Sequence, residues 1–174
     1  MRVINLWGPP GAGKSTVAAG LFYKMKVAGC KVELVTEYAK DVVWDNREDL
    51  LRDQLYLLAK QNRRLERLRG KVDWCITDSP ILLVLAYMPK DYYNNFNALT
   101  FDVWNSYNNI NFVLERNHEY KQDGRVQTEA EAFVIEDKIS SILSDYEQLC
   151  HFVNTGDAAD TIFERIKDYD LRIG

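Results

Sequence analysis

The amino-acid sequence predicts an α/β fold, a three-layer sandwich in which helices cover both faces of a parallel five-stranded sheet. Short apolar segments alternate along the chain with longer segments of helical periodicity, which is typical of a parallel sheet with crossover helices. The first apolar segment, Val3 to Trp7, leads into a glycine-rich loop and then a helical segment, so we expect it to be a central strand. The chain is long enough for one sizeable core, and we expect residues 1–174 to form a single domain.

The glycine-rich loop carries the most specific motif in the chain. Residues Gly8 to Thr16 satisfy the pattern G-x-x-x-x-G-K-[ST] of a P-loop NTPase. A loop that wraps a polyphosphate turns its N–H groups inward, and side chains at Gly11 and Gly13 would obstruct this. We expect Lys14 to meet the β- and γ-phosphates of ATP and Ser15 to offer its hydroxyl to Mg²⁺, near the positive end of a helix dipole. The expected nucleotide-binding residues are Pro10, Gly11, Ala12, Gly13, Lys14, Ser15 and Thr16.

The remaining elements follow from local sequence patterns. We expect further strands at residues 31–36, 72–77, 110–114 and 150–154, and helices at 17–28, 48–69, 129–143 and 158–169. The helix at 48–69 is predicted as one long amphipathic element, because leucines recur at helical spacing along it. Residues 38–46 are expected to form a short helical or irregular segment.

Two acidic residues are expected where strands end. Glu37 follows the second predicted strand, and Asp78 follows the third. Ligands of open α/β sheets bind at the carboxyl ends of the strands, so either carboxylate is placed to deprotonate an acceptor hydroxyl. Asp78 is also expected to hold Mg²⁺ together with Ser15. The alternative is that Asp78 only caps a helix opened by Pro80.

The fourth predicted strand runs into a basic segment. Arg116 and Arg125 lie in it, with Lys121 between them and Gly124 able to act as a hinge. Arginines on a mobile flap close over phosphates and over the charge that develops during transfer. We therefore predict a lid at about residues 116–127, with Arg116 and Arg125 as catalytic residues. A basic loop without a role is the alternative.

Two further segments are candidates for binding an acceptor. One stripe of the predicted helix is basic and would suit the phosphates of a nucleotide or of DNA, or would simply be a solvated face. It consists of Lys60, Arg63, Arg64, Arg67 and Lys71. Residues 92–109 interleave aromatic residues with asparagines. Aromatic rings stack on bases and amides recognise base edges, but a pair of helices packed by aromatic residues would have the same composition.

The composition limits the partners and the compartment. A net charge of −4 and a pI near 5.3 give no global attraction to nucleic acid, so DNA would have to bind at the basic helix from Lys60 to Lys71. Three widely spaced cysteines indicate buried thiols in a reducing compartment, and neither His118 nor His151 has the neighbours of a metal site. No apolar run approaches the length of a membrane span, so a cytoplasmic protein without membrane contact is expected.

The whole chain resembles the small P-loop nucleoside and nucleotide kinases, including thymidylate-kinase-like and nicotinamide-riboside-kinase-like members common in bacteriophages. The resemblance is carried by Gly8 to Thr16, Thr36-Glu37-Tyr38-Ala39, Asp78-Ser79-Pro80, and Arg116 to Arg125, which is similar to the lid of these kinases. The chain departs from the pattern at Ser79, where thymidylate kinases carry an arginine, and at Tyr38, where a proline is common. A subset of the phage members phosphorylates 5-hydroxymethyluracil within DNA, and the resemblance implies this base as one option for the acceptor.

Together these features predict an ATP- and Mg²⁺-dependent kinase that moves the γ-phosphoryl group onto a hydroxyl of a nucleoside, a nucleotide or a modified DNA base such as 5-hydroxymethyluracil. The expected catalytic residues are Lys14, Glu37, Asp78, Arg116 and Arg125. If it is phage-encoded, the protein would work in the host cytoplasm, and a homodimer is compatible with the sequence. The alternative is a P-loop NTPase switch or motor subunit that hydrolyses ATP without an acceptor.

Overall fold

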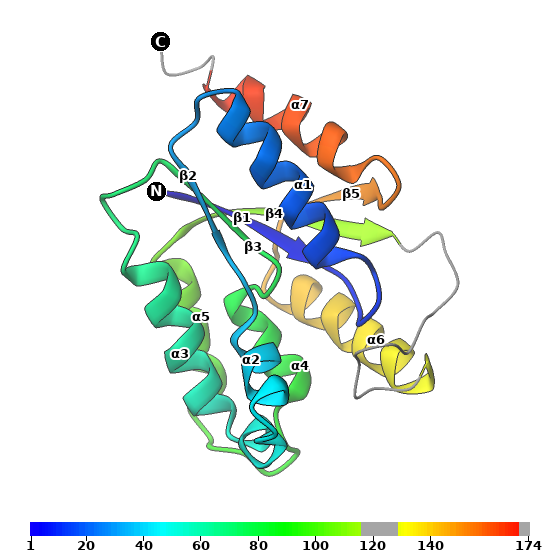
Figure 1. Cartoon of the computed structure of the whole chain (residues 1–174). Helices are drawn as coiled ribbons and strands as arrows, with labels where there is room; N and C mark the ends of the chain where they lie inside the picture. The colour runs from blue at the N-terminus through cyan, green and yellow to red at the C-terminus, as the bar shows by residue number, and fades with distance from the viewer. Residues whose placement is uncertain (116–128, 171–174) are drawn as a thin grey trace.

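The computed structural model describes residues 1–115 and 129–170 (Figure 1). Within these residues, five strands form one sheet in the order β2-β3-β1-β4-β5, and every neighbouring pair is parallel. The strands are β1 (Arg2–Trp7), β2 (Val32–Val35), β3 (Trp74–Thr77), β4 (Asn108–Glu115) and β5 (Cys150–Asn154). The predicted parallel five-stranded α/β fold is therefore confirmed, with the first strand at its centre.

Helices cover both faces of this sheet (Figure 1). They are α1 (Lys14–Val27), α2 (Tyr38–Trp44), α3 (Gln54–Glu66), α4 (Val84–Tyr87), α5 (Phe96–Asn105), α6 (Glu129–Asp145) and α7 (Ala158–Asp170), with the 3₁₀ helices η1 (Glu48–Arg52) and η2 (Ile81–Leu83). α1 and α7 pack on one face, where Ile4 and Leu6 of β1 are fully buried. α3, α4, α5 and α6 pack on the other face, around Val3 and Trp7 of the same strand. The alternation of side chains along β1 thus separates two core layers.

The central position of β1 brings three strand ends together. β3 pairs with one side of β1 and β4 with the other, so that Ile76 and Ile110 both lie opposite Ile4. β2 pairs with the far side of β3. The carboxyl ends of β1, β2 and β3 therefore lie at one edge of the sheet, where ligands bind in open α/β folds. The P-loop, the start of α2 and the turn before η2 follow these ends.

The prediction of a single helix over residues 48–69 is wrong. η1 and α3 are separate elements because Asp53 leaves helical geometry, with φ −85° and ψ 77°. The Asp53 carboxylate accepts a hydrogen bond from the N–H of Tyr56 at 3.0 Å, which caps the start of α3. α3 ends at Glu66 and turns follow, so Lys71 does not lie on the helix. The leucine spacing continues across both interruptions, which is why the pattern did not reveal them.

The aromatic residues of segment 92–109 contribute to the core. Phe96, Trp104 and Tyr107 are buried, and the rings of Trp104 and Trp7 meet edge to face with their centroids 5.9 Å apart. Such pairs stabilise a core beyond the area that they bury. Of the two interpretations of this segment, packing is therefore correct for these three side chains.

The cysteines differ in burial, whereas the sequence predicted three buried thiols. Cys30, Cys75 and Cys150 are free thiols, but only Cys75 is fully buried and the other two are half-buried. Burial raises the pKa of the Cys75 thiol to about 12 and that of Cys150 to about 11. Both thiols therefore stay protonated and unreactive at neutral pH. Among the described residues, no helix has the length and apolar character needed to cross a membrane.

Candidate active site

The P-loop turns tightly between β1 and α1, and its glycines make this path accessible. Gly8, Gly11 and Gly13 have φ values of 150°, 86° and 80°, which L side chains rarely adopt. A Cβ on Gly13 would also lie 2.8 Å from Cγ2 of Thr155, in the loop that follows β5. The Thr155 hydroxyl donates to the carbonyl of Ala12 at 3.3 Å, so these two loops pack together. Position 13 therefore requires glycine for packing as well as for backbone conformation.

Lys14 is the first residue of α1. The first N–H groups of an α-helix have no carbonyl partner within the helix, and the helix dipole favours an anion at this end. The Lys14 ammonium donates to the carbonyl oxygens of Gly8 at 2.7 Å and Pro9 at 3.0 Å. These contacts hold the cation over the loop, beside the N–H groups that would bind a phosphate. Ser15 and Thr16 follow in the first turn and are exposed.

Strand pairing brings Glu37 and Asp78 together. β2 and β3 are neighbours, with Val35 opposite Thr77, and the two acids come just after these strand ends. Glu37 is the N-cap residue of α2, and Asp78 is 6% exposed. Burial raises the pKa of each carboxyl group above its usual value, and the charge of Lys14 opposes the rise in both. The two acids thus lie near each other and near Lys14.

One oxygen of Asp78 is left without a hydrogen bond. Its Oδ1 is buried, and no donor in residues 1–115 or 129–170 reaches it. Leaving a buried carboxylate oxygen unpaired is costly, and such an atom is a natural ligand for a cation. Within the described chain, no three His, Cys, Asp or Glu side chains cluster into a larger cage. Asp78 with the Ser15 hydroxyl therefore fits Mg²⁺, which takes one or two protein oxygens and keeps several waters.

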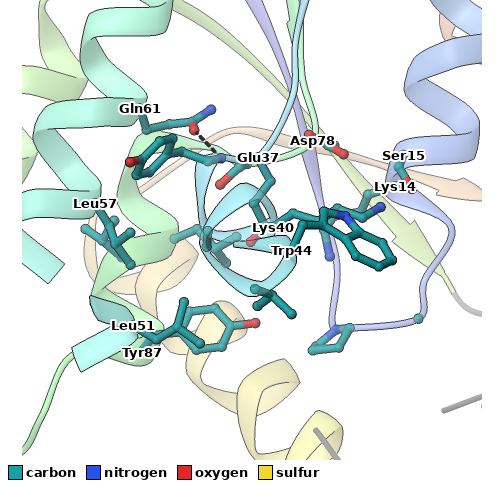
Figure 2. A pocket seen from close by; sticks show the side chains of 18 of the residues that line it. Lys14, Ser15, Glu37, Lys40, Trp44, Leu51, Leu57, Gln61, Asp78 and Tyr87 are labelled. Carbon is teal, nitrogen blue, oxygen red and sulfur yellow. Dashed lines mark hydrogen bonds between the residues drawn. The ribbon is translucent and has the colours of Figure 1, made fainter. Parts of the chain in front are cut away.

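A cavity of about 700 Å³ connects these residues (Figure 2). Its P-loop side is lined by Pro10, Gly11, Gly13, Lys14, Ser15 and Thr16, with Glu37 and Asp78 beside them. The rest, which we call the chamber, is lined mainly by Tyr38, Trp44, Leu51, Gln54, Leu57 and Tyr87. This volume lies within the range of about 300–1,000 Å³ that is usual for small-molecule sites.

Most residues predicted from the P-loop motif line the cavity, but Ala12 does not. Ala12 is fully buried in the apolar core beneath the loop, and its N–H donates to the carbonyl of Pro9 at 3.1 Å. A contact between Ala12 and a nucleotide stays a prediction. The expected lid at 116–127, with Arg116 and Arg125, lies outside the described residues.

The cavity also contains residues that the sequence did not single out. Gln54 and Gln61 are 2% and 3% exposed and come from the buried side of α3. Their signal in the sequence is a glutamine that recurs after seven residues on the leucine-rich side of a helix. Trp44 of α2 and Tyr87 of α4 also line the cavity, and nothing in their local sequence marks a site.

The two segments proposed from the sequence for acceptor binding do not line the cavity. None of the stripe residues Lys60, Arg63, Arg64, Arg67 and Lys71 borders it, and neither does segment 92–109. Arg64 forms an ion pair with Asp41, and the Lys60 ammonium lies 5.2 Å from the ring centroid of Tyr56. Arg64 also donates to the carbonyl of Thr36 at 3.0 Å, so part of the basic stripe is engaged within the fold.

Comparison with protein families agrees with this arrangement. The family profile described as "AAA domain" matches residues 3–160, from the first strand to the start of the last helix. No curated protein sequence matches the chain.

Solved structures with the same fold include thymidylate kinase from Ehrlichia chaffeensis, with a TM-score of 0.62 and 15% identity over 95% of this chain and 98% of that one. The fold is also similar to that of deoxyadenosine kinase from M. mycoides with bound dATP, with a TM-score of 0.59, 18% identity, and coverage of 97% and 98%. The same enzyme with dCMP and dCDP gives a TM-score of 0.57, 16% identity, and coverage of 95% and 99%. At these identities the likeness establishes the fold.

Proposed function

The chain belongs to the AAA domain family, and from this premise we propose that it is an ATP- and Mg²⁺-dependent kinase. It transfers the γ-phosphoryl group of ATP to the hydroxyl of a small acceptor. One observation carries the proposal: the P-loop, Glu37 and Asp78 border the same cavity, of about 700 Å³, as a chamber lined by aromatic and apolar side chains, which suits a nucleoside. A protein that only hydrolyses ATP has no need of such a chamber beside its P-loop.

The P-loop is the proposed ATP site. Its backbone N–H groups and the Lys14 ammonium would bind the phosphates, and Lys14 would turn from the Gly8 and Pro9 carbonyls toward the β- and γ-phosphates. Asp78 and Ser15 would hold Mg²⁺ with the help of water. When bound, the ion neutralises charge on the phosphate oxygens during transfer.

Glu37 is the proposed general base. The acceptor hydroxyl gives its proton to Glu37, its oxygen forms the new bond to the γ-phosphorus, and the bond to the bridging oxygen of ADP breaks. Burial raises the pKa of Glu37, which makes its carboxylate a better proton acceptor, while the charge of Lys14 limits the rise. Asp78 is assigned to the metal rather than to this step because its Oδ1 lacks a partner.

The carboxylates also bear on the choice of acceptor. A neutral hydroxyl needs a base, which Glu37 supplies, whereas the phosphate of a nucleotide is already anionic and needs none. We therefore favour a nucleoside, with its base in the chamber, over a nucleotide that accepts on its phosphate. 5-Hydroxymethyluracil within DNA also offers a neutral hydroxyl, but the base would have to be extruded to enter the chamber.

The remaining parts of the proposal come from the sequence. Arg116 and Arg125 would close over the phosphates as a lid and exclude water, which otherwise competes as acceptor. A phage origin, a cytoplasmic location and a homodimer stay predictions of the same kind.

The proposal is tested by incubating the protein with γ-labelled ATP, Mg²⁺ and one of three acceptors: mixed nucleosides, mixed nucleoside monophosphates, or DNA that contains 5-hydroxymethyluracil. We expect label in the nucleosides, and a fall of at least about 100-fold for Lys14→Ala with its thermal unfolding unchanged. Label found only in DNA would mean that the acceptor is a base in DNA and not a small molecule. Wild-type rates in Lys14→Ala would contradict the mechanism.

A P-loop NTPase switch or motor is the second candidate, and the AAA domain match is the observation that favours it. Such a protein would release phosphate at the same rate with or without acceptors. Label that passes to phosphate alone, under all three acceptor conditions, would select this candidate.

A further inference from the structure

Gln61 is a buried polar residue in the middle of α3, and it contacts two strand ends at once. Its Oε1 accepts a hydrogen bond from the backbone N–H of Tyr38 at 3.0 Å (Figure 2). Its Nε2 donates to Oγ1 of Thr77 at 3.3 Å and to the carbonyl of Thr36 at 3.4 Å. The orientation of the amide follows from the chemistry, because a backbone N–H only donates and a backbone carbonyl only accepts.

These three contacts are all made to residues that are adjacent in sequence to the two acids of the site. Thr36 and Tyr38 are the residues before and after Glu37. Thr77 immediately precedes Asp78, and its hydroxyl also accepts from the N–H of the residue after Asp78, Ser79, at 3.1 Å. A single side chain on α3 is therefore bonded on both sides of Glu37 and, through Thr77, to the turn that carries Asp78.

A glutamine at this position is costly unless its amide has partners. Gln61 is 3% exposed, and its neighbours on the buried side of α3 include Leu57, Leu58 and Leu65. Burying an amide without hydrogen bonds opposes folding, whereas a leucine or methionine would pack there at no such cost. The backbone after β2 and the Thr77 hydroxyl at the end of β3 supply those partners, so the amide holds the two strand ends relative to each other.

We infer that Gln61 is a positioning residue for phosphoryl transfer, which fixes Glu37 and Asp78 relative to each other and to the P-loop. The inference rests on the proposed function. Gln61 borders the cavity, but both ends of its amide bind Thr36, Tyr38 and Thr77, so it acts through the two acids. Because a small displacement of catalytic groups lowers the rate steeply, loss of these contacts should affect the chemical step most.

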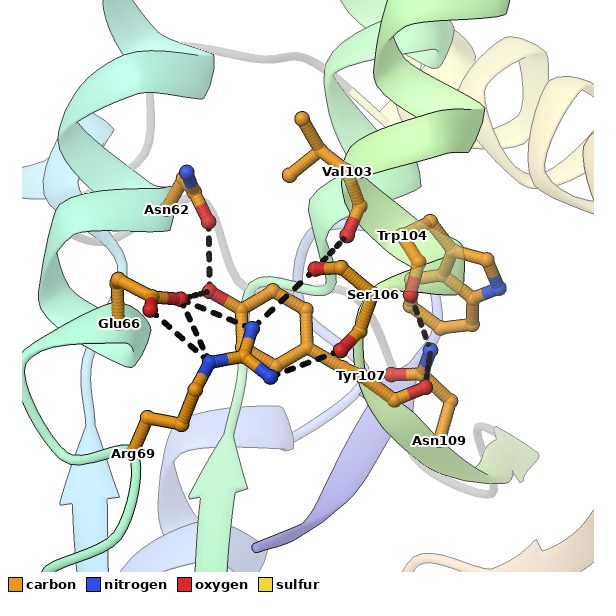
Figure 3. Close-up of polar contacts among 8 residues, drawn as sticks. All are labelled: Asn62, Glu66, Arg69, Val103, Trp104, Ser106, Tyr107 and Asn109. Carbon is orange, nitrogen blue, oxygen red and sulfur yellow. Dashed lines mark hydrogen bonds and ion pairs between the residues drawn. The ribbon is translucent and has the colours of Figure 1, made fainter.

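The test replaces Gln61 with methionine, which keeps the length and volume of the side chain and removes its hydrogen bonds. Asn62→Leu is the matched control, because Asn62 is the next residue of α3 and accepts from the hydroxyl of Tyr107 at 2.6 Å (Figure 3). Neither Asn62 nor Tyr107 lines the cavity. For both variants, kcat, KM for ATP and the midpoint of thermal unfolding are measured with the acceptor that the wild type phosphorylates. Both should unfold at somewhat lower temperature than the wild type.

We expect kcat of Gln61→Met to fall by about 10- to 100-fold with KM for ATP unchanged, because the P-loop is intact. Asn62→Leu should keep kcat within about twofold of the wild type. An equal fall in both variants, or a kcat of Gln61→Met within about twofold of the wild type, overturns the role of Gln61. If the wild type transfers no label to any acceptor, the proposed function itself fails, which is a distinct result.

A second variant keeps the test decisive if Gln61→Met does not fold. Thr77→Val keeps the shape of a fully buried side chain and removes the hydroxyl that links Gln61 to the turn at Asp78. A smaller fall in kcat, with KM for ATP unchanged, supports the inference. A kcat equal to that of the wild type overturns it.

Discussion

The two sides of α3 carry polar residues that do different things. The side toward the cavity has neutral amides, Gln54 and Gln61, set among leucines. The opposite side has a hydrogen-bonded group that joins α3 to the start of β4 (Figure 3). There the Tyr107 hydroxyl donates to Asn62 at 2.6 Å and to Glu66 at 3.1 Å. Arg69, in the turn after α3, donates to Glu66 at 2.9 Å, and its guanidinium lies 4.5 Å from the ring centroid of Tyr107.

The difference shows where charge is tolerated on this helix. Near solvent, Glu66 and Arg69 pair with each other and fix α3 to its neighbours without a large desolvation cost. Toward the cavity, a fully buried charge beside Glu37 and Asp78 would be costly, and there the neutral amide of Gln61 bonds at both strand ends. Of these two strand ends, the half-buried Arg64 reaches only that of β2, at Thr36. We therefore expect changes on the cavity side to alter activity, and changes on the opposite side to alter stability.

The largest effect on the cavity side is expected at Glu37. Glu37→Gln keeps the shape of the side chain and removes the base, so kcat should fall by about 10²- to 10⁴-fold. KM for ATP should stay the same, because the P-loop is untouched. Single-turnover transfer from labelled ATP measures the chemical step directly. A rate close to that of the wild type would move the base to Asp78.

The pH dependence of the wild type and of Glu37→Gln provides an independent check on the role of Glu37. Burial raises the pKa of Glu37 above its usual 4.5, so activity should fall as pH drops through this raised pKa. The stability of the wild type should instead be higher at low pH, since the fold favours the protonated carboxyl group of Glu37. The contribution of Glu37 is fully present below pH 4.5 and is lost as pH rises through the raised pKa. Glu37→Gln has no carboxyl group at this position and does not lose this stability. Urea unfolding should therefore show its free energy of unfolding rising relative to that of the wild type between pH 4 and pH 8. A pH-independent difference would contradict the assigned pKa shift.

An intermediate effect, on stability alone, is expected on the opposite side of α3. Tyr107→Phe removes a buried hydroxyl that donates to Asn62 and Glu66, so the free energy of unfolding should fall by about 1–2 kcal/mol. Burial raises the pKa of Tyr107 to about 12, so the hydroxyl remains a donor throughout the pH range of the assay. Urea unfolding measures the loss, and kcat should match the wild type. A large fall in kcat would mean that the two sides of α3 are not independent.

The smallest effect is expected for the exposed part of the basic stripe. Arg63 and Arg67 are exposed, so Arg63→Gln combined with Arg67→Gln should change the free energy of unfolding by less than about 0.5 kcal/mol. Transfer to a free nucleoside should be unchanged. If DNA is the acceptor, the same variant should bind DNA more weakly, with a shallower dependence on salt concentration. This comparison separates the two kinds of acceptor without touching the cavity.

The sequence was sufficient for the features that depend on local pattern. The alternation of strands and helices predicted the parallel sheet, and the motif from Gly8 to Thr16 predicted the loop between β1 and α1. Parallel strands end at one edge of a sheet, so the placement of Glu37 and Asp78 beside the P-loop also followed from chain order. Each of these inferences uses residues that are close in sequence, or a rule that all parallel sheets obey.

The tertiary structure decided which side chains complete the site. Gln61 bonds to Thr36 and Thr77, which are 25 and 16 residues away, and Tyr107 bonds to Asn62 across 45 residues. No local pattern records such pairings, because they depend on how α3 is rotated against the sheet. Charge made the basic stripe conspicuous in the sequence, yet burial against the strand ends made the neutral Gln61 the residue that bonds to the backbone on both sides of Glu37 and to the hydroxyl of Thr77 beside Asp78.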